Sequence, residues 1–236
     1  MIKAIFFDFD ETIFDHKHSA GKGLEELGKD YPALLSVPLE ELETELWRLM
    51  DWNYGRVLKK EITPMEARVE RIEGLFRYVE AEVPKHDLPR LAEIYSATYG
   101  EHSSFIEGVD ELIGELRERG YYLGIITNGM TKTQRARLEQ LGLDHYFDRM
   151  IASEEANSEK PNPEIFHYAL DFADCRPEEA LMIGDAWDKD IEGAIAVGMK
   201  AIWFKRRDHK MADVKRAGIA GSVAELRNIL VAEGLL

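Results

Sequence analysis

Four short segments of this 236-residue chain carry polar side chains suited to chemistry. They are residues 8–12 (DFDET), 127–129 (TNG), 160–161 (KP) and 184–190 (GDAWDKD). Aspartates in the first and last segments can bind a divalent cation, or act as nucleophile and as acid or base. The other two segments offer a hydroxyl, an amide, main-chain N–H groups and a lysine, which suit an anion. Carboxylates for a cation beside donors for an anion are what phosphoryl transfer requires.

Each segment also has an ordinary explanation when it is taken alone. The first could be a solvated acidic turn, the second a polar turn between a strand and a helix, and Lys160 a surface lysine. Asp188 and Asp190 could be charges favoured at a helix N-terminus. The chemical interpretation gains weight because every segment follows a predicted strand or lies in the loop beside one.

Short apolar runs predict the strands that position these segments. Runs at 3–7, 122–126, 181–183 and 201–204 indicate buried strands, and 150–152 a weaker one. Helical patterns lie between the later runs, and Thr131 with Gln134, and Ser222 with Glu225, predict capping boxes. Strands alternating with helices predict an α/β fold, a doubly wound (Rossmann-like) parallel sheet. Such sheets bind ligands beyond the carboxyl ends of their strands.

Residues 16–102 interrupt this alternation with helical patterns and no convincing strand. Helices are expected over 39–58, 65–79 and 88–99, and Thr63, Pro64 and Glu66 predict a capping box with proline in the first turn. We therefore expect a helical cap domain at 16–102, inserted after the first strand. Residues 1–15 and 103–236 would form the α/β catalytic core.

Composition limits the partners of this protein. The formal net charge of −15 argues against nucleic acid polymers and anionic membranes, which attract basic surfaces. A lone cysteine, Cys175, excludes an internal disulfide framework and fits a reducing compartment. The first residues do not resemble a signal peptide, and no stretch approaches the ~20 apolar residues of a membrane span. We expect a cytoplasmic monomer or homodimer.

In their order along the chain, the four segments resemble the four motifs of the haloacid dehalogenase-like hydrolase superfamily, and within it the phosphatases. Neither a Walker A loop nor a G-x-G-x-x-G or G-x-S-x-G motif occurs. The position of the helical insert is similar to that of the subgroup with a cap after the first motif. Residues 125–129, 138–143 and 153–155 resemble nucleotidase-like members, and N-acylneuraminate-9-phosphatase-like members nearly as well.

The resemblance implies a mechanism through an aspartyl-phosphate. Asp8 would be the nucleophile, and Asp10 would protonate the leaving alcohol and then deprotonate water. Asp8, the main-chain carbonyl of Asp10 and Asp185 would bind Mg²⁺. Asp190 would support both the metal and the catalytic Lys160.

The resemblance also assigns the phosphate-binding groups and the substrate class. Thr127, the main chain of Asn128 and Gly129, and Lys160 would hold the phosphoryl oxygens. A small phosphorylated metabolite is expected, with a nucleoside 5′-monophosphate as first candidate. Alternatives are phosphatases for sugar phosphates, N-acylneuraminate 9-phosphate or phosphoglycolate, a phosphomutase, or a non-catalytic scaffold. All three motif residues that a scaffold would be expected to lose are present: Asp8, Asp10 and Lys160.

The sequence also suggests roles for residues outside the four motifs, and it departs from the family pattern at two positions. Glu11 stands where relatives commonly have glycine, and Ala186 where many have serine or threonine. Asp15, Lys17 and the histidines His16 and His18 could reach a leaving group. The aromatic residues Trp47, Trp52 and Tyr54 are expected in the cap core rather than stacked on a base. The basic run at 205–207 is expected to be a solvated surface.

Overall fold

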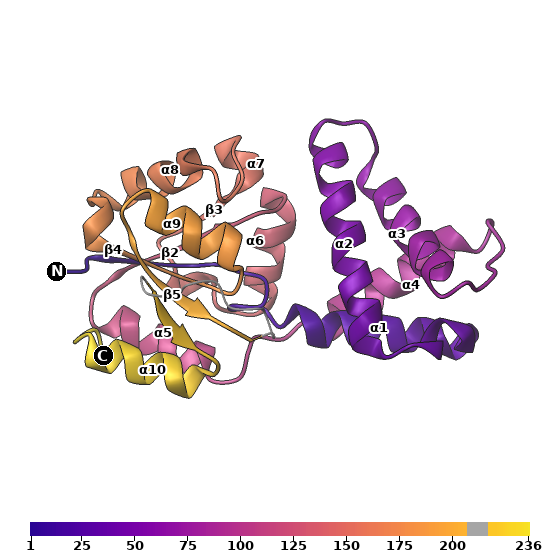
Figure 1. Cartoon of the computed structure of the whole chain (residues 1–236), viewed down its shortest axis with the longest axis horizontal. Coiled ribbons are helices and arrows are strands. Elements are labelled where there is room, and N and C mark those ends of the chain that lie inside the picture. The colour runs from indigo at the N-terminus through magenta and orange to yellow at the C-terminus, as the bar shows by residue number, and fades with distance from the viewer. Residues whose placement is uncertain (207–216) are drawn as a thin grey trace. The chain divides into compact units, whose positions relative to one another are not determined.

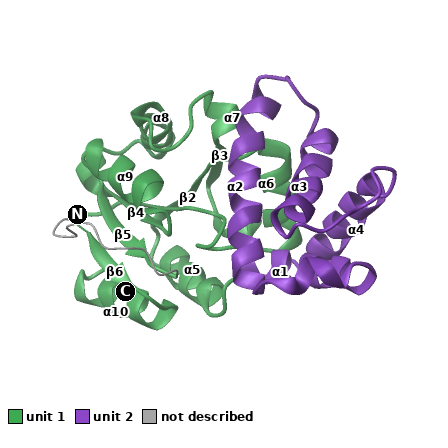
Figure 2. Ribbon diagram, turned by 45° about the vertical axis from the view of Figure 1, so that its right-hand side comes forward, with its two compact units in different colours: residues 1–15, 105–236 green, residues 16–104 purple. Residues whose placement is uncertain are grey.

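The computed structural model describes residues 1–206 and 217–236. The chain divides into two compact units, shown in separate colours in Figure 2. Unit 1 comprises Met1–Asp15 and Phe105–Leu236, and unit 2 comprises His16–Ser104. Unit 2 is therefore a continuous insertion into unit 1.

Six strands are described in unit 1, and they form one parallel sheet. They are β1 (Ala4–Phe7), β2 (Tyr122–Thr127), β3 (Arg149–Ala152), β4 (Ala180–Gly184), β5 (Lys200–Phe204) and β6 (Gly218–Ala220). Their order across the sheet is β3-β2-β1-β4-β5-β6. All four residues of the central strand β1 are buried, as expected for a strand covered on both faces.

Helices cover both faces of this sheet. Figure 1 shows α8 (Pro163–Ala173) and α9 (Glu192–Ala196) on one side, and α5 (Val109–Glu118) and α10 (Val223–Ala232) on the other. Phe166 of α8 packs in one buried cluster with Phe6 and Met182 of the sheet. The remaining helical elements are α6 (Thr131–Gln140), α7 (Ser153–Ala156), a π-helical turn at Trp187–Ile191 and 3-10 turns at Asp144–Tyr146 and Pro177–Glu179. The predicted doubly wound parallel sheet with a helical insertion after the first strand is confirmed.

The register of the central strands aligns their carboxyl ends. Phe7 of β1 lies opposite Ile125 of β2 and Ile183 of β4. From β1 the chain proceeds to β2 and β3 on one side, and later fills the other side with β4, β5 and β6. The boundary between β1 and β4 is thus a topological switch point, where open α/β sheets bind their ligands.

Unit 2 is helical throughout its regular structure. It contains α1 (His16–Asp30), a 3-10 turn at Pro32–Ser36, α2 (Leu39–Leu58), α3 (Pro64–Tyr78) and α4 (Leu88–Glu101). α1 packs against α4, and α2 against α3. Buried leucines of different helices, Leu24, Leu46 and Leu75, form part of its core. Thr63 caps α3 with the predicted capping box, since its hydroxyl accepts from Glu66 N and its own N–H donates to the Glu66 carboxylate.

Neither capping box expected in unit 1 is complete, although α6 begins at Thr131 as expected. α6 has Met130 as its N-cap, without a side-chain capping bond, so Thr131 and Gln134 do not form a capping box. Ser222 caps α10, accepting from Glu225 N at 3.2 Å, but the Glu225 carboxylate accepts from Gly221 N, so this capping box is only half formed. The short strand β6 had no prediction, because a three-residue strand is too short to show a pattern of alternation.

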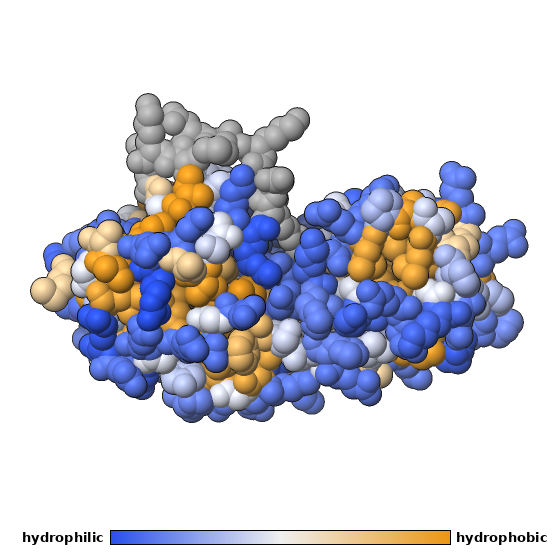
Figure 3. Space-filling model, turned by 90° about the horizontal axis from the view of Figure 1, so that it is seen from below, coloured by the Kyte–Doolittle hydropathy of each residue, from blue (hydrophilic) through white to orange (hydrophobic). Residues whose placement is uncertain are grey.

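Large apolar side chains are exposed at several separate places on the described part of the chain. Figure 3 shows one face of the molecule as mostly hydrophilic, with apolar residues in separate patches. Among the exposed apolar side chains are Trp52 of α2 and Val231 of α10. Within residues 1–206 and 217–236, no helix is both long and apolar enough to cross a membrane.

Candidate active site

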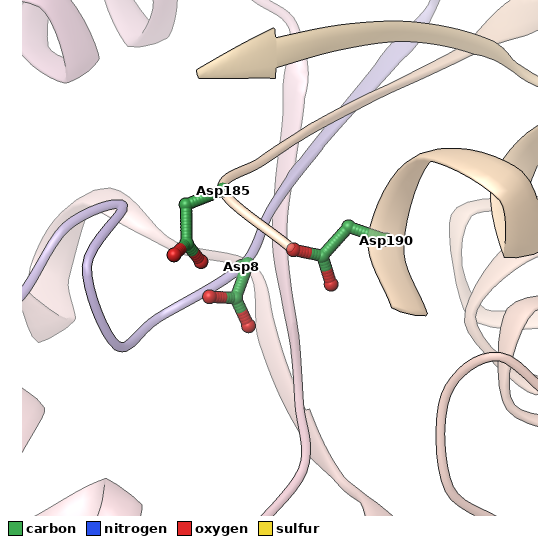
Figure 4. Close-up of side chains that lie close together, drawn as sticks. All are labelled: Asp8, Asp185 and Asp190. Carbon is green, nitrogen blue, oxygen red and sulfur yellow. The ribbon is translucent and has the colours of Figure 1, made fainter. Parts of the chain in front are cut away.

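Three aspartates meet at the carboxyl ends of β1 and β4. Asp8 follows β1 directly, Asp185 follows β4, and Asp190 lies in the π-helical turn after β4. One carboxylate oxygen from each lies within 4.8 Å of the others, and Figure 4 shows the three groups gathered together. Oxygen ligands at this spacing suit a hard divalent cation. The three aspartates therefore form a candidate metal site at the switch point.

Lys160 is the cation built into this cluster. Its side chain is buried, and its Nζ lies 2.5 Å from Asp8 Oδ1 and 2.7 Å from Asp190 Oδ1. The same nitrogen donates to the main-chain carbonyl of Ile126 at 2.7 Å. Asp8 Oδ1 and the Ile126 carbonyl accept hydrogen bonds from this ammonium group, and Asp190 Oδ1 forms an ion pair with it. The lysine is thus held in one position, with two of the three carboxylates beside it.

Burial and charge set the protonation of this pair. Burial raises the pKa of the Asp8 carboxyl from 3.8 to about 7, against the lowering effect of Lys160, and the charges of Asp190 and Asp10 add to the rise. Burial alone would lower the pKa of Lys160, but the charges of Asp190 and Asp8 outweigh it and raise that pKa. The cluster therefore has more negative charge than one ammonium can neutralise. This excess fits a site that takes up a divalent cation.

Two side-chain hydrogen bonds from Asn128 fix the main chain of Lys160. Asn128 Oδ1 accepts from Lys160 N at 2.8 Å, and Asn128 Nδ2 donates to Lys160 O at 3.0 Å. From the sequence, the Asn128 amide and main chain were considered only as groups for an anion, and the contact of this side chain with Lys160 was missed. Because the paired groups are 32 residues apart, no local pattern announces the contact.

The other two residues of the 127–129 segment also have defined partners. Thr127 is buried at the end of β2, and its hydroxyl accepts from Gln134 Nε2 at 3.0 Å. The main-chain N–H of Gly129 donates to Ser153 Oγ at 3.0 Å. In this structure, Gly129 therefore helps to shape the turn, and its predicted contact with an anion stays a prediction.

Asp10 lies beside two residues of α6. Its Oδ2 accepts from Gln134 Nε2 at 2.9 Å, and its Oδ1 lies 3.4 Å from Arg137 Nη1. Neither partner was expected from the sequence. The sequence predicts that Gln134 forms a capping box with Thr131, whereas its buried side chain donates to Asp10 in the site.

Gly184 allows Asp190 to approach the end of β4. A Cβ at this position would lie 2.3 Å from Asp190 Oδ2, closer than real Cβ contacts occur. The same oxygen accepts from the main-chain N–H of Ala186 at 3.0 Å. The hydrogen bond comes from the backbone, so the alanine at 186 keeps it.

Glu11 and Arg206 form a contact away from the three aspartates. Glu11 adopts a left-handed backbone with φ 63°, which explains why glycine is common in this position. Its buried carboxylate lies 3.4 Å from Arg206 Nη1, and Asp15 lies 3.5 Å from Arg206 Nη2. Arg206 is thus paired with acids, contrary to the solvated run expected at 205–207. Arg207 lies outside the described residues.

His16 belongs to the core of unit 2. It is buried, its Nδ1 lies 2.7 Å from the hydroxyl of Tyr99, and its ring lies 4.2 Å from that of Trp47. Trp47 therefore packs within unit 2 as expected. Trp52, in contrast, is 67% exposed, so its expected place in the core is wrong.

Comparison with known proteins agrees with this architecture. A haloacid dehalogenase-like hydrolase family model matches residues 5–204. The chain is 33% identical to a glyceraldehyde 3-phosphate phosphatase of Methanopyrus kandleri, over 87% of this chain and 85% of that protein. It is 30% identical to the pyrimidine 5′-nucleotidase YjjG of Escherichia coli, over 96% of each chain.

A solved structure extends the similarity to the fold. The HAD hydrolase YfnB of Bacillus subtilis, described as bound to magnesium, matches with a TM-score of 0.74 and 26% identity. The match covers 98% of this chain and 99% of that one. The relatives differ in their named substrates, so they do not determine a subgroup. The family match, the full-length relatives and the shared fold all agree: this chain belongs to the haloacid dehalogenase-like hydrolase family.

Proposed function

We propose that this protein is a Mg²⁺-dependent phosphomonoester hydrolase that acts through an aspartyl-phosphate on Asp8. The observation that carries the proposal is the contact of Asp8 with Lys160 inside a cluster of three aspartates at the switch point. A buried carboxylate held by a lysine and adjoined by cation ligands suits attack on a phosphoryl group. The phosphatase names of the relatives in the family support the same reaction class.

Asp8 would supply the nucleophilic oxygen. Lys160 donates to Oδ1 of Asp8. Within the described residues, Oδ2 of Asp8 accepts no hydrogen bond from the protein. An oxygen of Asp8 attacks phosphorus, the bond from phosphorus to the leaving oxygen breaks, and Asp10 donates a proton to that oxygen. Asp10 then takes a proton from water as the water oxygen attacks phosphorus and the bond from phosphorus to the Asp8 oxygen breaks. Inorganic phosphate leaves, and the Asp8 carboxylate is regenerated.

Asp8, the main-chain carbonyl of Asp10 and Asp185 would hold the magnesium ion, with Asp190 orienting Lys160 beside it. When bound, the ion supplies positive charge that neutralises the phosphoryl oxygens and the carboxylates around them. Thr127, the main-chain N–H of Asn128 and Lys160 would hold the phosphoryl oxygens. Hydrogen bonds from the Asn128 side chain keep the lysine in place for this task.

We propose a small organic phosphate as the substrate. The relatives named for glyceraldehyde 3-phosphate support a sugar phosphate, and the pyrimidine 5′-nucleotidase supports a nucleoside monophosphate. The helical unit 2, inserted directly after the loop that carries Asp8 and Asp10, is the proposed source of selectivity. A screen should include triose and hexose phosphates, pyrimidine 5′-monophosphates, N-acylneuraminate 9-phosphate and phosphoglycolate.

Phosphate release from an aryl phosphate, with Mg²⁺ and with EDTA, tests the reaction class. Wild type is expected to release phosphate only with Mg²⁺, and Asp8→Asn should lose this activity. Asp188→Asn is the matched control, because Asp188 is exposed and lies outside the three-aspartate group. Equal, metal-independent background from wild type and Asp8→Asn would refute catalysis and favour a scaffold. An isomeric phosphate product with little free phosphate would indicate a phosphomutase.

A further inference from the structure

Gln134 is a buried amide on an otherwise largely polar, exposed helix. It lies in the second turn of α6 and is only 3% exposed, while its neighbours Thr133 and Arg135 are exposed. A buried amide is costly unless its donors and acceptor are satisfied. Its partners therefore indicate why the chain has a glutamine at this place.

Hydrogen bonds determine the orientation of the Gln134 amide. Arg137 Nη1 donates to Gln134 Oε1 at 3.1 Å. An arginine side chain can only donate, so the oxygen of the amide must face Arg137 and the nitrogen must face the other way. That nitrogen donates to Asp10 Oδ2 at 2.9 Å and to Thr127 Oγ1 at 3.0 Å.

This arrangement distinguishes the two oxygens of Asp10. An oxygen that faces an N–H donor can accept from it but cannot itself point a proton at it. Oδ2 accepts the shorter bond, 2.9 Å from Gln134, and among the described residues Oδ1 accepts only the longer one, 3.4 Å from Arg137 Nη1. Because its contact is the longer and weaker one, Oδ1 is the oxygen better placed to exchange a proton with a leaving group. Likewise, the Thr127 hydroxyl accepts from Gln134 and keeps its own proton to donate elsewhere.

The turn after β2 is built to admit this amide. A Cβ on Gly129 would lie 2.8 Å from Gln134 Nε2 and 2.9 Å from its Cγ. Any side chain at 129 would push Gln134 away from Asp10 and Thr127. Gly129 thus has a role in the site that does not require contact with an anion.

We infer that Gln134 is a positioning residue for Asp10: its amide, oriented by Arg137, holds Oδ2 and leaves Oδ1 as the oxygen that passes the proton to the leaving alcohol. The inference rests on the proposed function, since it concerns the acid of that reaction. Gln134 acts through Asp10 and Thr127 and does not itself transfer a proton.

The dependence of kcat/KM on the leaving group tests this role. This parameter includes every step up to release of the alcohol, so it reports protonation of the leaving oxygen. An alkyl phosphate needs that proton, and a nitrophenyl phosphate, with its stable phenolate, hardly needs it. Gln134→Met, which keeps the size of the side chain and removes its hydrogen bonds, should lower kcat/KM about 10-fold or more for the alkyl phosphate. For the nitrophenyl phosphate, the loss should stay within about threefold.

Matched variants separate positioning from general disturbance. Thr133→Met introduces the same side chain at an exposed position of α6 and should leave both rates unchanged. Arg137→Met should repeat the leaving-group-dependent loss of Gln134→Met, whereas Arg135→Met, whose arginine faces Glu155 at 3.2 Å, should not. Gln134→Glu keeps the shape of the side chain and loses the Nε2 donors to Asp10 and Thr127. It replaces the methionine variant in this test if that variant does not fold.

The outcomes distinguish this inference from the proposed function. A loss confined to substrates with poor leaving groups supports the positioning role. With active wild type, an equal loss for both substrates, or no loss, overturns the inference and leaves the proposed function standing. Wild type without Mg²⁺-dependent activity on either substrate overturns both.

Discussion

Replacing Lys160 by methionine should destabilise unit 1 far more than the loss of an ordinary lysine. The methionine keeps the length of the buried stem and removes the ammonium that contacts Asp8, Asp190 and the Ile126 carbonyl. Removing one partner of a buried ion pair costs about 3–5 kcal/mol, because a charge is left buried and unpaired. Here two carboxylates lose their common partner, so we expect a loss in this range at pH 8.

The loss should depend on pH. Lys160 lowers the pKa of Asp8, so without the lysine that pKa rises further above its wild-type value of about 7. At pH 5, Asp8 is protonated in both proteins and places no unpaired charge beside Asp190. At pH 8, the variant must either bury the unpaired Asp8 carboxylate or keep Asp8 protonated at a pH at which the unfolded carboxyl is ionised. The free energy of unfolding should therefore fall by more at pH 8 than at pH 5.

Urea unfolding in EDTA measures this difference. Trp187 and Trp203 report on unit 1, and Trp47 and Trp52 of unit 2 can be replaced by phenylalanine in the background used for all variants.

Lys200→Met is the matched control for this substitution. Lys200 pairs with Glu233 at 2.9 Å, but both side chains are at least half exposed. Such a pair contributes about 0.2–1 kcal/mol. If Lys160→Met costs no more than Lys200→Met at pH 8, the ammonium does not neutralise the cluster. An equal loss at pH 5 and pH 8 would refute the coupling between Lys160 and Asp8.

Three further predictions concern the same site. Without metal, the free energy of unfolding should fall by up to about 4 kcal/mol as pH rises from about 4 to about 7. The reason is that the pKa of Asp8 is about 7 in the folded protein, against 3.8 for the unfolded carboxyl. Urea titrations in EDTA across this pH range measure the slope. Gly184→Ala should lower the free energy of unfolding by about 1–3 kcal/mol through overpacking, because the new Cβ would meet the Asp190 carboxylate. Thermal unfolding measures this loss. Asn128→Ala removes both hydrogen bonds to the main chain of Lys160. It should reduce the free energy of unfolding by about 1–3 kcal/mol and also lower the rate of phosphate release. Both quantities are measured on the same samples.

Each of these predictions has a contrary outcome. Stability that rises between pH 4 and pH 7 without metal would contradict the raised pKa of Asp8. Gly55→Ala is the control for Gly184→Ala, because no atom lies within 4 Å of its added Cβ and alanine favours the helix; similar losses for both would contradict the steric argument. Full activity in Asn128→Ala would show that Lys160 keeps its position without the amide.

Local patterns in the sequence were sufficient to predict five of the six described strands and the edge of the sheet that carries the site. Runs that later form β1 and β4 are apolar throughout because they are buried on both faces, and their aspartates follow at once. Parallel register then brings Asp8 and Asp185 to one edge. The roles of Asp8 and Asp10 came from the resemblance of motifs, since the residues alone left a solvated turn open.

Tertiary structure decided which side chains meet within the site. Gln134 reaches Asp10 across 124 positions of sequence, and Lys160 reaches Asp8 across 152. Locally, Thr131 and Gln134 match a capping box, but the partly buried carboxyl of Asp10 and the buried hydroxyl of Thr127 offer the amide partners that a solvent-exposed cap does not. Burial makes an unpaired polar group costly, so the amide turns inward. The sequence by itself determined where strands end and chemistry gathers, and only the packed fold decided which donors and acceptors satisfy one another there.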